Sequence, residues 1–204
     1  MMNPKLDLKK IHRNCYTAGS EPKLIQVPDL TYIAFDGEGN PGTSPLFAQA
    51  MGVLYGLVYT AKFMCKEREQ DFTVMPLEGT WWSENMDDFL NGNKDSWKWT
   101  VMIAVPDYLD QKLFEEAREK LAGKKDVPGL EKGYRQVFGD GLSVQLLHIG
   151  PYSGETENIR RLHIFAEEQG CRLAKKHREI YLSDPNRTAP GKLKTIIRQP
   201  VEKI

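Results

Sequence analysis

Apolar residues along the chain fall into short runs and helix-spaced sets. Residues 30–35 form a β-branched and aromatic run typical of a strand, and a glycine-rich turn over residues 36–42 closes it. Ser44-Pro45 favours a helix start, because it places a hydroxyl at the N-cap and a proline in the first turn. Strands are also predicted at residues 72–78 and 97–105. The helix after Ser44-Pro45 is predicted from apolar positions spaced by three and four: Phe47, Met51, Leu54, Val58 and Ala61.

The second half of the chain repeats this order. The pattern predicts a strand at residues 142–149, a Gly/Pro turn at 150–154, a helix that ends near Gly170, and strands at 178–182 and 193–198. Each half therefore contains a strand, a turn, a helix and two strands. This arrangement predicts an α+β fold of pseudo-two-fold tandem strand-helix-strand-strand repeats, with an antiparallel sheet and helices on one side of it.

The two half-repeats span about residues 28–105 and 140–200, and each is too short to be a comfortable separate domain. Between them lies a predicted helical insertion at about residues 107–135, with Asp107 as the cap of its helix. Residues 1–27 are polar and follow no regular period, so an irregular N-terminal segment is expected there.

Composition then narrows the class of partner. The 204 residues include 28 Lys+Arg and 28 Asp+Glu, for a formal net charge of +0, so no global basic field favours nucleic acid or an anionic membrane. No window approaches the roughly 18–20 consecutive apolar residues of a membrane span, and no secretory leader is evident. Three widely spaced cysteines suggest neither a disulfide framework nor a metal site. A cytoplasmic protein with a hydrophobic small-molecule partner is expected.

The glycines of residues 37–42 have the spacing G-x-G-x-x-G between a predicted strand and a predicted helix, as in a dinucleotide-binding fingerprint. Asp36 and Glu38 would place carboxylates where a pyrophosphate must sit, and Pro41 removes an amide donor. We therefore interpret the glycines as serving a tight connection.

Two glutamates are candidates for chemistry. Glu78 and Glu179 occupy equivalent places in the half-repeats, and each is close to aromatic residues. A carboxylate among aromatic faces is desolvated, which raises its pKa and suits it to act as a general base or as a counter-charge for a cationic ligand. Symmetry would direct both toward one central cleft. The alternative is that both are solvated strand-edge residues.

Aromatic residues near strand ends and turns are candidates for the wall of a ligand site. They could stack on a flat apolar ligand, although a role in the core is equally open. Consecutive side chains of an extended segment point to opposite faces, so only one of Trp81 and Trp82 should line the cleft, and Trp82 is favoured. The other candidates of this kind are Phe35, Trp99, Tyr152 and Tyr181.

His148 is a further candidate, as a base or a ligand contact, but it has no partner at metal-ligand or catalytic-triad spacing. A satisfied strand histidine is the alternative. The sequence therefore suggests no metal and no cofactor, and a haem role would have no convincing axial ligand beyond His148.

The chain resembles the GyrI-like small-molecule-binding family of the SOUL superfamily from about residue 28 to its end. The resemblance implies a single domain over residues 28–204, built as tandem units around a central ligand cleft. In similar drug-binding domains of transcription regulators, a buried glutamate among aromatics receives lipophilic cations, and that glutamate matches Glu179. The segments that carry the resemblance are residues 77–82, 145–152, 179–185 and 193–200.

No helix-turn-helix segment is evident in residues 1–27, so the chain resembles the stand-alone branch, as does the insertion at 107–135. Some members of that branch look like hydrolases that open the strained cyclopropane of DNA-alkylating natural products. The resemblance therefore implies a detoxifying hydrolase in which Glu179 activates a water, while Tyr152 or Tyr181 hydrogen-bonds the substrate.

Two other functions stay open. The same cleft could bind or sequester small molecules without chemistry, or the protein could bind a macromolecular partner such as gyrase. The sequence leaves the oligomeric state undetermined.

Overall fold

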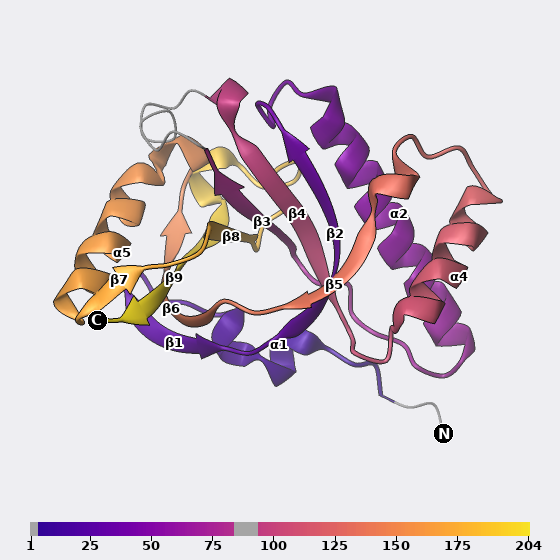
Figure 1. Cartoon of the computed structure of the whole chain (residues 1–204), viewed down its shortest axis with the longest axis horizontal. Helices are drawn as coiled ribbons and strands as arrows, with labels where there is room; N and C mark the ends of the chain where they lie inside the picture. The colour runs from indigo at the N-terminus through magenta and orange to yellow at the C-terminus, as the bar shows by residue number, and fades with distance from the viewer. Residues whose placement is uncertain (1–3, 84–93) are drawn as a thin grey trace.

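The computed structural model describes residues 4–83 and 94–204, whose strands form one antiparallel sheet (Figure 1). The strand order is β1-β6-β9-β8-β3-β4-β2-β5, and the short β7 pairs with β9. The strands are β1 Lys23–Val27, β2 Leu30–Glu38, β3 Leu77–Trp82, β4 Lys98–Val105, β5 Tyr134–Phe138, β6 Gly141–Ile149, β7 Cys171–Leu173, β8 His177–Tyr181 and β9 Lys194–Lys203.

The predicted tandem α+β architecture is confirmed. One half contributes the neighbouring strands β3-β4-β2, and the other contributes β8-β9-β6 in the equivalent order. The halves meet where β3 pairs with β8, with Gly79 opposite Glu179 and Thr80 opposite Arg178. The helices are α1 Leu8–Ile11, α2 Pro45–Glu67, α4 Gln111–Ala122 and α5 Thr156–Glu168.

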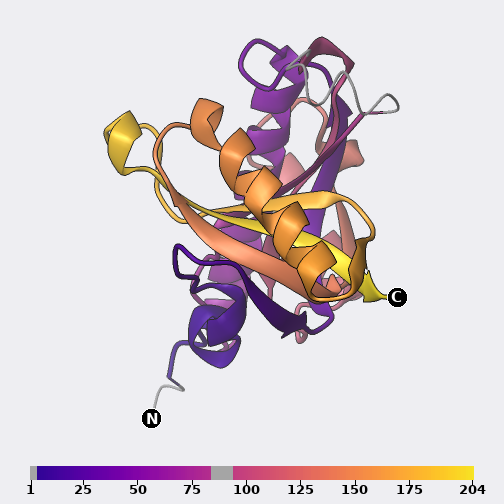
Figure 2. The same ribbon diagram turned by 90° about the vertical axis from the view of Figure 1, so that its left-hand side faces the viewer.

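One face of the sheet, called here the helix face, carries α2, α4 and α5. Helix α2 packs on β2 and β4, α4 packs on α2, and α5 packs on β6, β7 and β9. Figure 1 shows α5 over one end of the sheet and α2 with α4 over the other, and Figure 2 shows α5 crossing its strands. The central strands β3 and β8 therefore lie between the two groups of helices. No described helix has an apolar stretch long enough to cross a lipid bilayer.

Several predicted elements need correction. The strand predicted at 72–78 is wrong: β3 begins at Leu77, after Pro76, which has no amide hydrogen to donate to a ladder. Residues 4–27 are not irregular, because they contain α1 and β1, and β9 continues through Pro200. The predicted cap Asp107 is also wrong. Helix α4 is capped by Asp110, whose carboxylate accepts a hydrogen bond from the amide of Leu113, whereas the carboxylate of Asp107 accepts one from the Thr31 hydroxyl.

The glycine string has a packing role. Gly37 lies directly opposite Trp99 in the β2–β4 ladder, and a Cβ at Gly37 would lie 2.1 Å from the Trp99 ring. Only glycine leaves room for that buried indole. The Trp99 Nε1–H donates to the carbonyl of Gly39 at 3.1 Å, which fixes the ring over the strand end.

The face of the sheet opposite the helices holds a buried ionic network. Arg178 Nη1 donates to Glu78 Oε2 at 2.8 Å, and Arg178 Nε lies 2.9 Å from Asp140 Oδ2. Arg198 Nη1 also reaches Asp140, at 3.4 Å. Arg178 and Glu78 are each only 1% exposed, so these charges depend on one another and not on water.

The N-terminal segment completes this network. The Tyr16 hydroxyl donates to Glu78 Oε1 at 2.9 Å, and Arg198 Nη2 donates to the backbone carbonyl of Cys15. Arg198 Nε donates to Gln145 Oε1 at 3.1 Å. The described N-terminal residues therefore satisfy buried charges of the sheet.

We expect Glu78→Gln to lower the free energy of unfolding by about 3–5 kcal/mol, because it removes one partner of a buried ion pair and leaves the Arg178 charge undercompensated. Urea denaturation followed by circular dichroism measures this change. The matched control is Glu202→Gln, which breaks the exposed pair with Arg172 and should cost about 0–1 kcal/mol. Equal small losses in both variants would contradict a structural role for the network.

Candidate functional site

A buried carboxylate lies on the helix face at the centre of the sheet. Glu179 is on β8, directly opposite Gly79 on β3 and Ile197 on β9. Because alternate residues of a strand share a face, His177 and Tyr181 point to the same side as Glu179. Glu179 is 9% exposed, so its carboxylate relies on protein partners.

A chain of hydrogen bonds holds this carboxylate. The Trp81 indole Nε1–H donates to the Tyr181 hydroxyl at 3.0 Å, and that hydroxyl donates to Glu179 Oε2 at 2.7 Å. His177 Nε2 lies 3.4 Å from the other oxygen, Glu179 Oε1. Burial and the negative charge of Glu179 hold the pKa of Tyr181 well above its usual value, so the phenol stays a donor.

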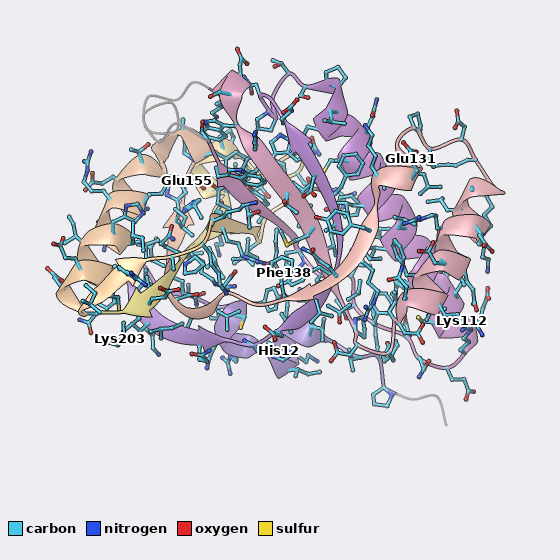
Figure 3. The ribbon with its side chains drawn as sticks, in the orientation of Figure 1. His12, Lys112, Glu131, Phe138, Glu155 and Lys203 are labelled. Carbon is cyan, nitrogen blue, oxygen red and sulfur yellow. The ribbon has the colours of Figure 1, made fainter. Side chains whose placement is uncertain are left out.

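A second carboxyl group, Glu155, lies beside Glu179. It is the residue before α5, where the turn after β6 ends (Figure 3), and it is 5% exposed. Burial first, and then the charge of Glu179, raise the pKa of Glu155 to about 9. Glu155 therefore holds a proton at neutral pH, and its Oε1 atom has no hydrogen-bond partner among the described residues.

Sequence reasoning missed Glu155. It looks like an ordinary acidic residue at a helix start, and only its position after the predicted turn at residues 150–154 singles it out. Its proximity to Glu179 depends on long-range pairing of β6, β9 and β8.

Aromatic side chains surround the two carboxyl groups. The Tyr152 ring meets Tyr181 edge to face, with centroids 5.6 Å apart. Phe47 of α2 packs against Trp81, with centroids 6.2 Å apart, and edge to face against Trp99 at 5.2 Å. The Trp81 indole lies over Gly79 of the same strand. A Cβ at that position would lie 2.8 Å from Trp81 Nε1, so a glycine is needed there to make room for the ring.

Several predicted site residues lie on the helix face but differ in their exposure to solvent. Phe35 and Trp99 are fully buried and stack on each other at 6.5 Å, so they lie beneath the aromatic layer. Tyr152 is 37% exposed, and burial raises its pKa above the usual value. His148 fixes the turn that carries Tyr152 and Glu155, since its ring nitrogens contact the Pro151 carbonyl at 3.1 Å and the Asn158 amide at 2.9 Å.

Two predicted residues lie elsewhere. The expectation that Glu78 and Glu179 share one cleft is wrong, because Glu78 pairs in register with Ile180 and so points to the opposite face, into the ionic network. The expectation that Trp82 joins Glu179 is also wrong: Trp81 does so, and Trp82 lies on the other face beneath the ammonium group of Lys176. Glu78 and Glu179 are therefore not at equivalent positions of the two repeats, since the helices of both repeats lie on one face and only Glu179 points to it.

The described part of the chain holds no group of three His, Cys, Asp or Glu suited to a metal ion. The site instead combines one protonated carboxyl, a second carboxyl bound by a phenol, and an aromatic layer. In such a pair, the ionised carboxyl group can accept a proton from a water, and the protonated one can donate a proton to a reacting group. The pair can equally offer negative charge to a cationic ligand.

Comparisons with known proteins identify a family for the chain and structures of the same fold. The family model of the GyrI-like small molecule binding domain matches residues 20–202. A structure described as an uncharacterized conserved protein from Listeria innocua is 36% identical, with a TM-score of 0.91, and 97% of this chain and 100% of that chain are covered. A structure described as a hydrolase from Listeria innocua is 35% identical, with a TM-score of 0.86 and the same coverage.

A more distant structure, the EcmrR C-terminal domain, shares the fold alone. It is 15% identical with a TM-score of 0.60, and the match covers 90% of this chain and 98% of that one. No curated protein matches the chain.

We expect the free energy of unfolding to fall as pH rises from about 4.5 to about 9, the range in which Glu155 is protonated in the folded state and ionised in the unfolded state. Its pKa is about 9 in the folded state against an ordinary 4.5, so the folded state binds one more proton than the unfolded state between these values. The free energy of unfolding then declines with pH by up to about 1.4 kcal/mol per pH unit. Urea unfolding of wild type and Glu155→Gln from about pH 5.5 to about pH 8.5 measures this, since the variant should lack the decline.

The control for that experiment is Glu157→Gln, an exposed carboxylate in the first turn of α5. It should keep the wild-type slope. Parallel pH profiles for wild type and Glu155→Gln would contradict the assignment of a proton to Glu155.

Proposed function

The chain belongs to the family of GyrI-like small molecule binding domains, and we propose that it is a hydrolase that opens strained, electrophilic cyclopropane rings with water. Its substrate is a planar, largely apolar genotoxin that stacks on the aromatic layer beside Glu179. The observation that carries the proposal is the pairing of two buried carboxyl groups, Glu155 and Glu179, the second of which accepts a hydrogen bond from Tyr181. Its likeness to a Listeria innocua protein described as a hydrolase also supports it.

In this mechanism Glu179 takes a proton from a water. The water oxygen forms a bond to a ring carbon as a C–C bond of the cyclopropane breaks, and the electron pair of that bond passes to a conjugated carbonyl oxygen. The proton that Glu179 took from the water then passes to that oxygen, which completes the addition of one water and restores the carboxylate. General-base help is worth about 10²–10⁴-fold, which suffices for an electrophile already activated by ring strain.

Tyr152 is the better candidate for the group that hydrogen-bonds the developing oxyanion. The Tyr181 hydroxyl already donates to Glu179 and accepts from Trp81. The Tyr152 hydroxyl has no hydrogen-bond partner among the described residues, and its side chain is 37% exposed. Its raised pKa keeps the phenol protonated at neutral pH.

The second candidate function is binding without chemistry. The negative charge of Glu179 beside Trp81 and Tyr181 also suits a lipophilic cation, which aromatic faces attract. A protein of this kind would protect a target in proportion to its own concentration and release the ligand unchanged.

We expect Glu179→Gln to reduce turnover of a cyclopropane-bearing alkylator by about 10²–10⁴-fold, because the amide cannot accept the proton of water. Mass spectrometry of the product, which gains one water, measures the reaction. Glu157→Gln, which changes an exposed carboxylate of α5, should retain wild-type turnover. Undiminished turnover in Glu179→Gln would remove Glu179 from the mechanism, and tight binding with no product in wild type would favour sequestration.

Tyr152→Phe should lower kcat by about 10²-fold or more while substrate affinity changes little, because the hydroxyl contacts an oxyanion that exists only as the ring opens. Steady-state kinetics separate kcat from KM. The matched control is Tyr59→Phe, a phenol on the exposed side of α2. A rise in KM with unchanged kcat would limit Tyr152 to ligand binding.

A further inference from the structure

A separate cavity of about 380 Å³ lies on the face opposite the helices. Its volume falls within the range of small-molecule sites. Figure 3 labels Phe138 on β5, which forms one wall. The residues around it are Thr80, Thr100, Gln136, Phe138, Gly139, Asp140, Lys175, Lys176 and Arg178. Neither Glu155 nor Glu179 belongs to this set, because β3 and β8 separate the two faces.

The floor of this cavity is a buried guanidinium group with an unused donor. Arg178 Nη1 donates to Glu78, and Nε lies 2.9 Å from Asp140 Oδ2 without a hydrogen bond to it, so neither Nε nor Nη2 has a hydrogen-bond acceptor among the described residues. Thr80 lies directly opposite Arg178 in the ladder, and its hydroxyl also has no partner among the described residues. A 99% buried arginine with a free N–H donor at a cavity is suited to an oxyanion.

The charged side chains in and around the cavity sum to one net positive charge. Arg178 and Arg198 are balanced by Glu78 and Asp140 within the ionic network. At the rim, Lys175 Nζ donates only to the backbone carbonyls of Gly139 and Asp140, and Lys176 Nζ lies 3.1 Å from the centroid of the Trp82 ring. Asp36, which accepts from Thr100 and Tyr134, is the carboxylate whose charge acts on Lys176.

We propose that this cavity is a second ligand site, which binds a small organic monoanion. The carboxylate of the ligand accepts from Arg178 Nη2 and the Thr80 hydroxyl, the two lysines attract it, and a flat apolar body packs against Phe138. The inference does not depend on the hydrolase proposal, since the two sets of residues lie on opposite faces of the sheet.

Isothermal titration calorimetry with benzoate at low ionic strength tests the proposal on the full chain. Benzoate should bind with one-to-one stoichiometry, and the neutral benzamide should bind about tenfold or more weakly, since it lacks the charge that Arg178 recognises. Lys176→Gln and Thr80→Val should each weaken benzoate by about threefold to tenfold. The matched control Lys192→Gln removes an exposed lysine from the loop before β9 and should leave the affinity unchanged.

Several results would overturn the proposal. These are absence of saturable benzoate binding, equal affinity for benzamide, and wild-type affinity in both Lys176→Gln and Thr80→Val. Tighter binding of inorganic phosphate than of benzoate would contradict the apolar part of the site. Glu179→Gln should bind benzoate like wild type, so loss of binding in that variant would assign benzoate to the helix face instead. Because Lys176 is exposed, its variant tests the charge even if Thr80→Val folds poorly.

Discussion

The pairing of β3 with β8 determines which side chains the centre of the sheet presents on each of its faces. This ladder joins the two half-repeats and sets Gly79 opposite Glu179 and Thr80 opposite Arg178. Since neighbouring residues of a strand point to opposite faces, one step along β8 separates an acidic, aromatic site from a buried cationic one. A register shift by one residue would bury Glu179 among the arginines and expose Arg178 to the aromatic layer.

Each face then stabilises its charge differently. On the helix face, burial forces one of two carboxyl groups to keep its proton, and phenol and indole donors hold the other. On the opposite face, full charges remain because each has a counter-charge within bonding distance.

Much of the fold could be predicted from the sequence because periodicity and turn chemistry are local. The run at 30–35, the helix start at Ser44-Pro45 and the duplicated order of elements all correspond to real elements. The faces of the sheet could not be predicted in the same way, because the face to which a side chain points depends on the register of strand pairing, which is a long-range property. Glu78 pairs with Ile180, one residue away from Glu179, so Glu78 and Trp82 point away from Glu179. Glu155 could not be identified from the sequence, because it comes to lie beside Glu179 only when β6, β9 and β8 pair.

The N-terminal segment bears on where this domain begins. The matched family region starts at residue 20, yet the carbonyl of Cys15 and the hydroxyl of Tyr16 complete the coordination of Arg198 and Glu78. A version of the protein trimmed to the matched region would leave an arginine and a glutamate short of partners inside the sheet. The smallest autonomous folding unit should therefore extend beyond the region that the family shares, and boundaries drawn by similarity alone would cut through its interior.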